Sequence, residues 1–212
     1  MAEILVVSPH PDDESLGCGG AIRRHVEHGD RVSVIFLTSG ERGWRGHSAE
    51  ETARVREGEA ETAAQILGVA AVEFWREADG DLRATAALAH RIRERVERDR
   101  PDRMYVTHDA EMHPDHRAAA EIAQSALASF REAPLPALLG FEVWTPLQAI
   151  DEILDITDQL PAKLAAIRAH HSQCEVLAFD AAFEGLARYR GEMHSWPGGP
   201  YAEVFRRLDT VP

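Results

Sequence analysis

The 212-residue chain has little cysteine and no long apolar run, and each shortage excludes a class of protein. Two cysteines, Cys18 and Cys174, are too few for a disulfide framework, so we expect a protein of the reducing cytoplasm. No apolar run approaches the ~18 residues that a membrane-spanning helix needs. No basic segment or cleavage site accompanies the first apolar run, so the sequence predicts no signal peptide.

Positive charge is also scarce. Lys and Arg number 23 against 36 Asp and Glu, which gives a net charge of −13. Because phosphate binding requires a basic surface, we expect no nucleic-acid partner. The hydrophobic share of 44% and the charged share of 28% are typical of a soluble globular protein, and the length predicts one domain over residues 1–212.

Several cofactor and catalytic motifs are missing as well. The segment Gly17-Cys18-Gly19-Gly20 follows an apolar run, but Ile22 stands at the third glycine position of a dinucleotide fingerprint. We therefore expect these glycines to allow close backbone packing where a helix starts. A metallo-β-lactamase pattern would need histidine where Glu111 stands, and the chain has no HExxH or GxSxG.

Short β-branched runs alternate with longer amphipathic stretches along the chain. Strands are expected at residues 4–7, 32–38, 72–75, 103–107, 140–144 and 150–156, and helices at residues 20–28, 49–67, 85–98, 114–130, 159–171 and 181–188. This alternation predicts right-handed βαβ crossovers. The expected fold is α/β and Rossmann-like, with a mostly parallel sheet and helices on both faces.

Two unusual polar segments fall where such a fold binds ligands, beyond the carboxyl ends of the strands. The segment His10-Pro11-Asp12-Asp13-Glu14 follows the first expected strand. The segment His113-Pro114-Asp115-His116 follows the fourth. We expect both segments to face one crevice.

Histidine and carboxylate side chains in these segments suit a catalytic zinc site, which has three protein ligands and one position open for water. A tight turn presents His10 and Asp13 to one ion. Pro114 starts a helix whose first turn carries His113 and His116 on one face. We assign His10, Asp13 and His116 as ligands, and spacing alone leaves His113 as an alternative. Two histidines and one carboxylate also suit Fe²⁺.

The remaining polar side chains of the two segments suit acid–base chemistry. Asp12 adjoins a ligand and is placed to act as general base on a water whose pKa the metal lowers. His113 is then free to polarise a carbonyl group or to donate a proton to a leaving amine. Asp115 is expected to hold the His113 ring and to favour its charged form.

A series of short motifs runs in order along nearly the whole chain. They are ILVVSPHPDDESLGCGG at residues 4–20, TSGERG at 38–43, VREGEAETAAQILGV at 55–69, THDAEMHPDHRAA at 107–119, DIT at 155–157, HHSQ at 170–173 and YAEVF at 201–205. In this series the chain resembles the PIG-L/LmbE-like N-deacetylase family. The pair HPDDE and HPDH is the most specific part of the resemblance.

The resemblance implies an LmbE-like deacetylase fold and a set of functional residues. The zinc ligands that it implies are His10, Asp13 and His116. It also implies Asp12 as general base and His113 as the acid or the oxyanion stabiliser. Arg56 matches an arginine of the family that contacts substrate, and Tyr201 matches a tyrosine near the site.

The function that the resemblance implies is removal of an N-acetyl group from an amino sugar, such as an N-acetylglucosamine glycoside or glycoconjugate. One alternative is an amidase of the same fold that cleaves another amide, such as a thiol conjugate. Another is a non-catalytic sugar-binding module, although such a module would have little use for Asp12 and His113. Because relatives are often oligomeric, a homo-oligomer is also expected.

Overall fold

Seven strands form one sheet in the order β3-β2-β1-β4-β5-β7-β6. The structure is a computed structural model that describes residues 1–130, 135–194 and 198–209. The strands are β1 (Glu3–Ser8), β2 (Arg31–Thr38), β3 (Ala71–Glu77), β4 (Arg103–Thr107), β5 (Ala137–Phe141), β6 (Glu152–Asp155) and β7 (Ala202–Arg207). The helices are α1 (Asp13–Glu27), α2 (Ala49–Leu67), α3 (Ala86–Asp99), α4 (Pro114–Ala128), α5 (Leu160–Ala169), α6 (His171–Cys174) and α7 (Phe179–His194).

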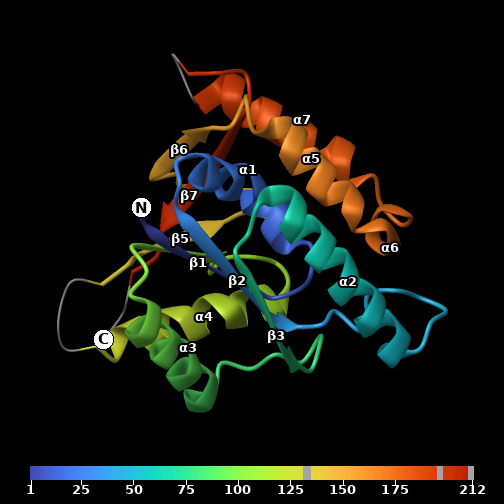
Figure 1. Ribbon diagram of the computed structural model, residues 1–212, viewed down its shortest axis with the longest axis vertical. Helices are drawn as coiled ribbons and strands as arrows, with labels where there is room; N and C mark the ends of the chain where they lie inside the picture. The colour runs from blue at the N-terminus through green and yellow to red at the C-terminus, as the bar shows by residue number, and fades with distance from the viewer. Residues whose placement is uncertain (131–134, 195–197, 210–212) are drawn as a thin grey trace.

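The sheet is mostly parallel, as the sequence predicts. Strands β1 to β5 pair in parallel, and β7 pairs antiparallel with both β5 and β6. Helices cover both faces: α1, α2, α5 and α7 lie on one side, and α3 and α4 lie on the other (Figure 1). The predicted fold class is therefore confirmed.

Strand β1 lies between two apolar layers, which explains its continuous apolar run. Ile4 and Val6 belong to the core under α1, α2, α5 and α7. Leu5 and Val7 point the other way and pack in the core under α3 and α4. Successive side chains of a strand point to opposite faces, so a strand that is buried on both faces needs apolar residues at every position.

Helix α2 has the bounds that the sequence predicts. The Ser48 side chain accepts a hydrogen bond from the amide of Glu51 at its start, and Gly68 ends it with φ 84°. Helix α1 begins at Asp13, well before the predicted residue 20, and it is kinked within the glycine segment, where Cys18 has the non-helical φ of −140° and ψ of 20°. A Cβ atom at Gly17 would lie 2.1 Å from the Phe141 ring, so the expected close packing is confirmed.

The last third of the chain differs most from the prediction. Strand β5 ends at Phe141 instead of Trp144, because the next backbone amides turn away to bind a buried carboxylate described below. Strand β7 was not predicted, and it lies between β5 and β6. The predicted helix at residues 159–171 is divided into α5 and α6.

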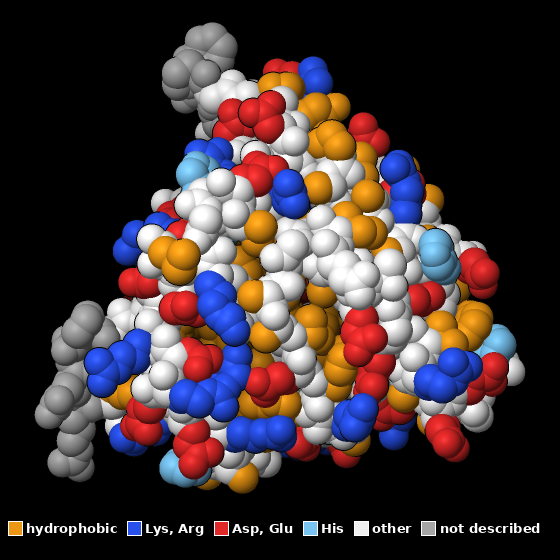
Figure 2. Space-filling view, viewed as in Figure 1, with side chains coloured by type: hydrophobic (Ala, Val, Ile, Leu, Met, Phe, Trp, Pro, Cys, Tyr) orange, Lys and Arg blue, Asp and Glu red, His pale blue; other side chains and the backbone are white. Residues whose placement is uncertain are grey.

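The strand order reverses at β1 and β4, which pair with each other in the middle of the sheet. The segments that follow these two strands therefore lie side by side at one edge, where ligands bind in this fold. No helix among the described residues is long and apolar enough to cross a membrane. Acidic and basic side chains are interspersed over the face shown in Figure 2.

Candidate active site

Three donor atoms from the two predicted segments converge at the edge of the sheet. His10 Nδ1 lies 3.1 Å from Asp13 Oδ2, His116 Nε2 lies 3.2 Å from the same oxygen, and the two ring nitrogens are 3.3 Å apart. Ligand bonds of about 2.0–2.1 Å at tetrahedral angles separate donor atoms by about 3.3 Å. The three atoms therefore have the spacing of three corners of a tetrahedral zinc site.

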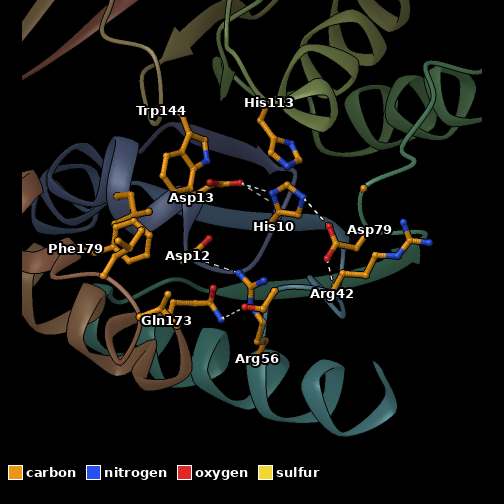
Figure 3. A pocket seen from close by; sticks show the side chains of 15 residues that line it. His10, Asp12, Asp13, Arg42, Arg56, Asp79, His113, Trp144, Gln173 and Phe179 are labelled. Carbon is orange, nitrogen blue, oxygen red and sulfur yellow. Dashed lines mark hydrogen bonds and ion pairs between the residues drawn. The ribbon is translucent and has the colours of Figure 1, made fainter. Parts of the chain in front are cut away.

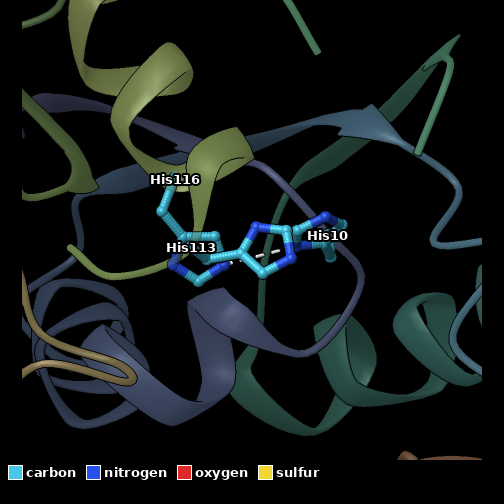
Figure 4. A group of neighbouring side chains, drawn as sticks. All are labelled: His10, His113 and His116. Atoms are coloured by element: carbon cyan, nitrogen blue, oxygen red, sulfur yellow. Dashed lines mark hydrogen bonds between the residues drawn. The ribbon is translucent and has the colours of Figure 1, made fainter. Parts of the chain in front are cut away.

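His113 completes a cluster of histidine rings around this point (Figure 4). Its ring centroid is 4.9 Å from those of both His10 and His116. As the N-cap residue of α4, His113 accepts a hydrogen bond at Nδ1 from the amide of Asp115 at 3.2 Å. In the neutral ring the proton is then on Nε2, which makes that nitrogen a donor. Burial, and then the charges of His10 and His116, lower the pKa of His113.

Carboxylates surround the far nitrogen of His10. Its Nε2 lies 3.1 Å from Asp79 and 3.2 Å from Asp115. Although burial opposes it, hydrogen bonds with these two and Asp13 raise the pKa of His10. Asp115 is itself fixed by the amides of Gly80 and Leu82. A carboxylate that accepts the second N–H of a ligand histidine fixes its tautomer and directs the free lone pair towards the metal.

The position of Asp115 differs from the expectation that it holds the His113 ring, although its negative charge does act to raise the pKa of His113, against the larger effect of burial. Its carboxylate contacts His10, while the contact with His113 is made by its backbone amide. The reason is the start of α4, where His113 caps the helix and the Asp115 side chain turns towards β3 and β1. Asp115 therefore acts on the site through His10.

Asp12 is held beside the three donor atoms by an unusual backbone. Its φ of 123° lies where residues other than glycine are rarely found, which is typical of strained functional positions. Burial raises the pKa of the Asp12 carboxyl, and the charge of Asp13 adds to this, while Arg56 opposes it. A carboxylate with a raised pKa is a stronger base than an exposed one.

The two predicted substrate-binding residues lie in different places. Arg56 lines the cavity, where it lies 3.1 Å from Asp12 and donates hydrogen bonds to the carbonyls of Pro11 and Gly40. Tyr201 is not among the described cavity residues. Its ring lies 5.3 Å from the guanidinium of Arg188.

A cavity of about 360 Å³ adjoins the site (Figure 3). That volume is at the lower end of the range for small-molecule sites, about 300–1,000 Å³. The described residues that line it are His10, Asp12, Asp13, Leu16, Arg42, Gly43, Arg56, Asp79, Gly80, His113, Trp144, Gln173, Val176, Leu177 and Phe179. The cavity is therefore large enough for a small-molecule ligand.

Sequence reasoning missed two buried carboxylates at this site. The motifs assign no role to Asp79, although it follows strand β3 at the same edge of the sheet as His10 and His116, and that position was the available signal. Glu111 lies 3.9 Å from Nδ1 of His116 and accepts hydrogen bonds from three amides after β5. No local pattern indicates such a role, because its partners lie more than 30 residues away.

The fold and the His/Asp cluster define an α/β protein with a candidate metal centre at the switch point of its sheet. Residues 5–127 match the model of a family described as PIG-L: GlcNAc-PI de-N-acetylase. The chain belongs to this family, as the motifs predict.

Two deacetylases resemble the whole chain. The diacetylchitobiose deacetylase of Thermococcus kodakarensis is 29% identical over 232 residues, covering 100% of this chain and 85% of that protein. The structure of the N,N'-diacetylchitobiose deacetylase of Pyrococcus horikoshii has a TM-score of 0.86 and 26% identity, covering 99% of this chain and 84% of that one. The named relatives thus include hydrolases of N-acetylated sugars.

A relative with a different activity is at least as similar in structure. The 4-carboxy-2-hydroxymuconate hydratase of Pseudomonas putida has a TM-score of 0.88 and 28% identity, covering 100% of this chain and 97% of that one. Overall similarity alone therefore does not separate hydrolysis from hydration. The chemistry of the cavity has to be compared with each substrate.

Proposed function

We propose that the protein is a zinc-dependent hydrolase that removes the N-acetyl group from an amino sugar of the N-acetylglucosamine type. The observation that carries the proposal is the triangle of His10 Nδ1, Asp13 Oδ2 and His116 Nε2 beside the Asp12 carboxylate. The names of the deacetylase relatives support it.

The side chains around the triangle have complementary tasks in amide hydrolysis. When bound, zinc supplies a Lewis acid for the carbonyl oxygen and lowers the pKa of a water molecule. Asp12 takes a proton from the attacking water, and Nε2–H of His113 donates a hydrogen bond to the oxygen that becomes negative. Asp12 then returns its proton to the nitrogen as the C–N bond breaks, so the products are acetate and the free amine.

Hydration of a carboxylated substrate is the second candidate, because of the similarity to the hydratase. The charges that line the cavity favour the neutral acetamide. Three aspartates, Asp12, Asp13 and Asp79, line it together with two arginines. Arg56 is already bound to Asp12 and to two carbonyl groups, which leaves Arg42 as the free cation among the described lining residues. Arg42 is thus the one arginine of the described lining that is left to pair with a carboxylate of the substrate, whereas a substrate with several carboxylates requires several cationic partners.

The experiment is a screen of the purified protein for acetate release from N-acetylglucosamine, its methyl glycoside and diacetylchitobiose. A parallel assay follows the ultraviolet absorbance of a conjugated, carboxylated diene. We expect acetate release that stops with a chelator and returns with zinc, and no change of the diene. Hydration without acetate release would contradict the proposal, and so would acetate release that is insensitive to the chelator.

Four finer predictions accompany this proposal. Amides of thiol conjugates belong in the same screen, since they test the amidase alternative. Ferrous iron is to be compared with zinc in the reconstitution, because the ligand set suits both. The cytoplasmic location and the homo-oligomer stay predictions from the sequence.

A further inference from the structure

One side of the active-site cavity is apolar. We call its four side chains the apolar wall: Trp144, Val176, Leu177 and Phe179. Trp144 is 44% exposed, Val176 66% and Leu177 46%. Single exposed apolar residues are ordinary, but several around one cavity mark a contact site. Figure 3 shows Trp144 and Phe179 on the side opposite to Arg42 and Asp79.

The backbone around Trp144 is fixed by two buried polar side chains, Glu111 and His108. Glu111, 1% exposed, accepts hydrogen bonds from the amides of Val143 at 2.7 Å, Trp144 at 2.9 Å and Thr145 at 3.2 Å. His108 Nε2 lies 2.7 Å from the carbonyl oxygen of Thr145. The backbone that bears the exposed indole ring is therefore held in place beside the cavity.

The other half of the apolar wall comes from the turn between α6 and α7. The amides of Val176 and Leu177 both donate to the carbonyl of Gln173, at 3.0 and 3.2 Å, and the amide of Phe179 donates to Leu177 at 2.8 Å. The ring of Phe179 meets that of Trp144 edge-on, with centroids 5.8 Å apart. Two segments distant in sequence thus make one continuous apolar surface.

The opposite side of the cavity carries charged groups and backbone, including Arg42, Arg56 and Asp79. Sugar hydroxyl groups find hydrogen-bond partners there. The side chains of Val176 and Leu177 offer no hydrogen-bond partner, so they add contact area for an apolar group and no specific contact for sugar hydroxyl groups. The chemistry of the wall therefore suits an apolar group next to the sugar.

We propose that the apolar wall binds an apolar aglycone, an alkyl or aryl group attached to the amino sugar, so that the substrate is an amphipathic N-acetylated glycoside. This inference rests on the proposed function. The wall is continuous with the cavity that His10 and Asp13 line, which places an aglycone on the wall when the acetamide lies at these two residues.

The test compares the methyl and octyl glycosides of N-acetylglucosamine, of one anomer, with diacetylchitobiose. Initial rates of acetate release give kcat and KM for each. We expect the KM of the octyl glycoside to be about tenfold or more below that of the methyl glycoside, because apolar surface leaves water. Chitobiose is expected to resemble the methyl glycoside.

Variants assign this difference to the wall. In Trp144→Ser and in the double variant Val176→Ser with Leu177→Ser, the ratio of the two KM values is expected to fall towards one. Met193→Ser is the matched control, since Met193 is 63% exposed on α7 and does not line the cavity. It is expected to keep the wild-type ratio. Circular dichroism of each variant reports whether it is folded.

Three results would overturn the inference. They are equal KM values for the methyl and octyl glycosides, a wall-dependent preference for chitobiose over the octyl glycoside, and a double variant of lower mass in light scattering with an unchanged KM ratio. The last would mean that a second copy of the chain covers the wall. Calorimetric titration of Asp12→Asn with both glycosides measures binding without turnover. It therefore tests the wall even if no acetate is released, which would contradict the proposed function alone.

Discussion

The two sides of the cavity are built in different ways. The polar floor consists of the lining residues His10, Asp12, Asp13 and His113 together with the fully buried His116. Its side chains are fixed by one another and by buried carboxylates. The apolar wall is fixed through its backbone, and most of its side chains reach the solvent. The comparison teaches that the floor is suited to chemistry on any acetamide, whereas the wall selects what is attached to it.

The largest effect is expected from removing a floor ligand. His116→Ala should abolish metal binding and reduce acetate release to background with every substrate, because two ligands do not retain zinc in a catalytic site. Metal content measured by mass spectrometry checks this against His90→Ala, a control on the exposed surface of α3. Full metal content in His116→Ala would remove this residue from the ligand set.

Asp12→Asn should separate chemistry from metal binding. Loss of a general base lowers kcat by about 10²- to 10⁴-fold, while the metal content stays that of the wild type. The matched control is Asp81→Asn, since Asp81 is an exposed carboxylate paired with Arg83. Near-normal kcat in Asp12→Asn would show that another group activates the water.

Asp115→Asn tests whether the carboxylates behind His10 support the floor. The variant should bind zinc about 10- to 100-fold more weakly, because the Nε2–H of His10 loses a charged acceptor. Competition with a chromogenic chelator measures the affinity. Asp79→Asn should give a shift in the same direction, and unchanged affinity in both variants would limit these residues to a structural role.

Glu111→Gln should give the smallest effect, and this effect should extend to the apolar wall. It weakens the hydrogen bonds to the amides of Val143, Trp144 and Thr145, at a cost of about 1–3 kcal/mol in the free energy of unfolding. Denaturant titration measures this cost against Glu94→Gln, an exposed control. The KM ratio of the octyl and methyl glycosides should also move towards one, and an unchanged ratio would show that Trp144 keeps its place without this carboxylate.

Local sequence patterns were enough to predict most of the parallel half of the fold. Ser48 and Gly68 mark the ends of α2 by cap chemistry, and the apolar run of β1 shows burial on both faces. Strand β7 could not be found in this way, because its place between β5 and β6 depends on pairing with residues 47 to 68 positions away in the sequence.

The residues of the site also divide into those that the local sequence indicates and those that depend on distant contacts. The segments that follow β1 and β4 predicted the convergence of His10, Asp13 and His116, since the ends of adjacent parallel strands meet at one edge. The same rule, applied to β3, would have predicted Asp79 as a residue of the site. Glu111 and the exposed position of Trp144 result from contacts between distant segments, which spacing does not contain.

The most direct test of the central claim is reconstitution of the metal-free protein. Zinc is added in steps to chelator-treated protein, and acetate release from an N-acetylglucosaminide is measured at each step. If the polar floor binds one zinc ion, activity should rise to a maximum at about one zinc per chain, and the activity of His116→Ala should not respond to added zinc. Full activity before any metal is added, or zinc bound at this ratio with no acetate released, would contradict it.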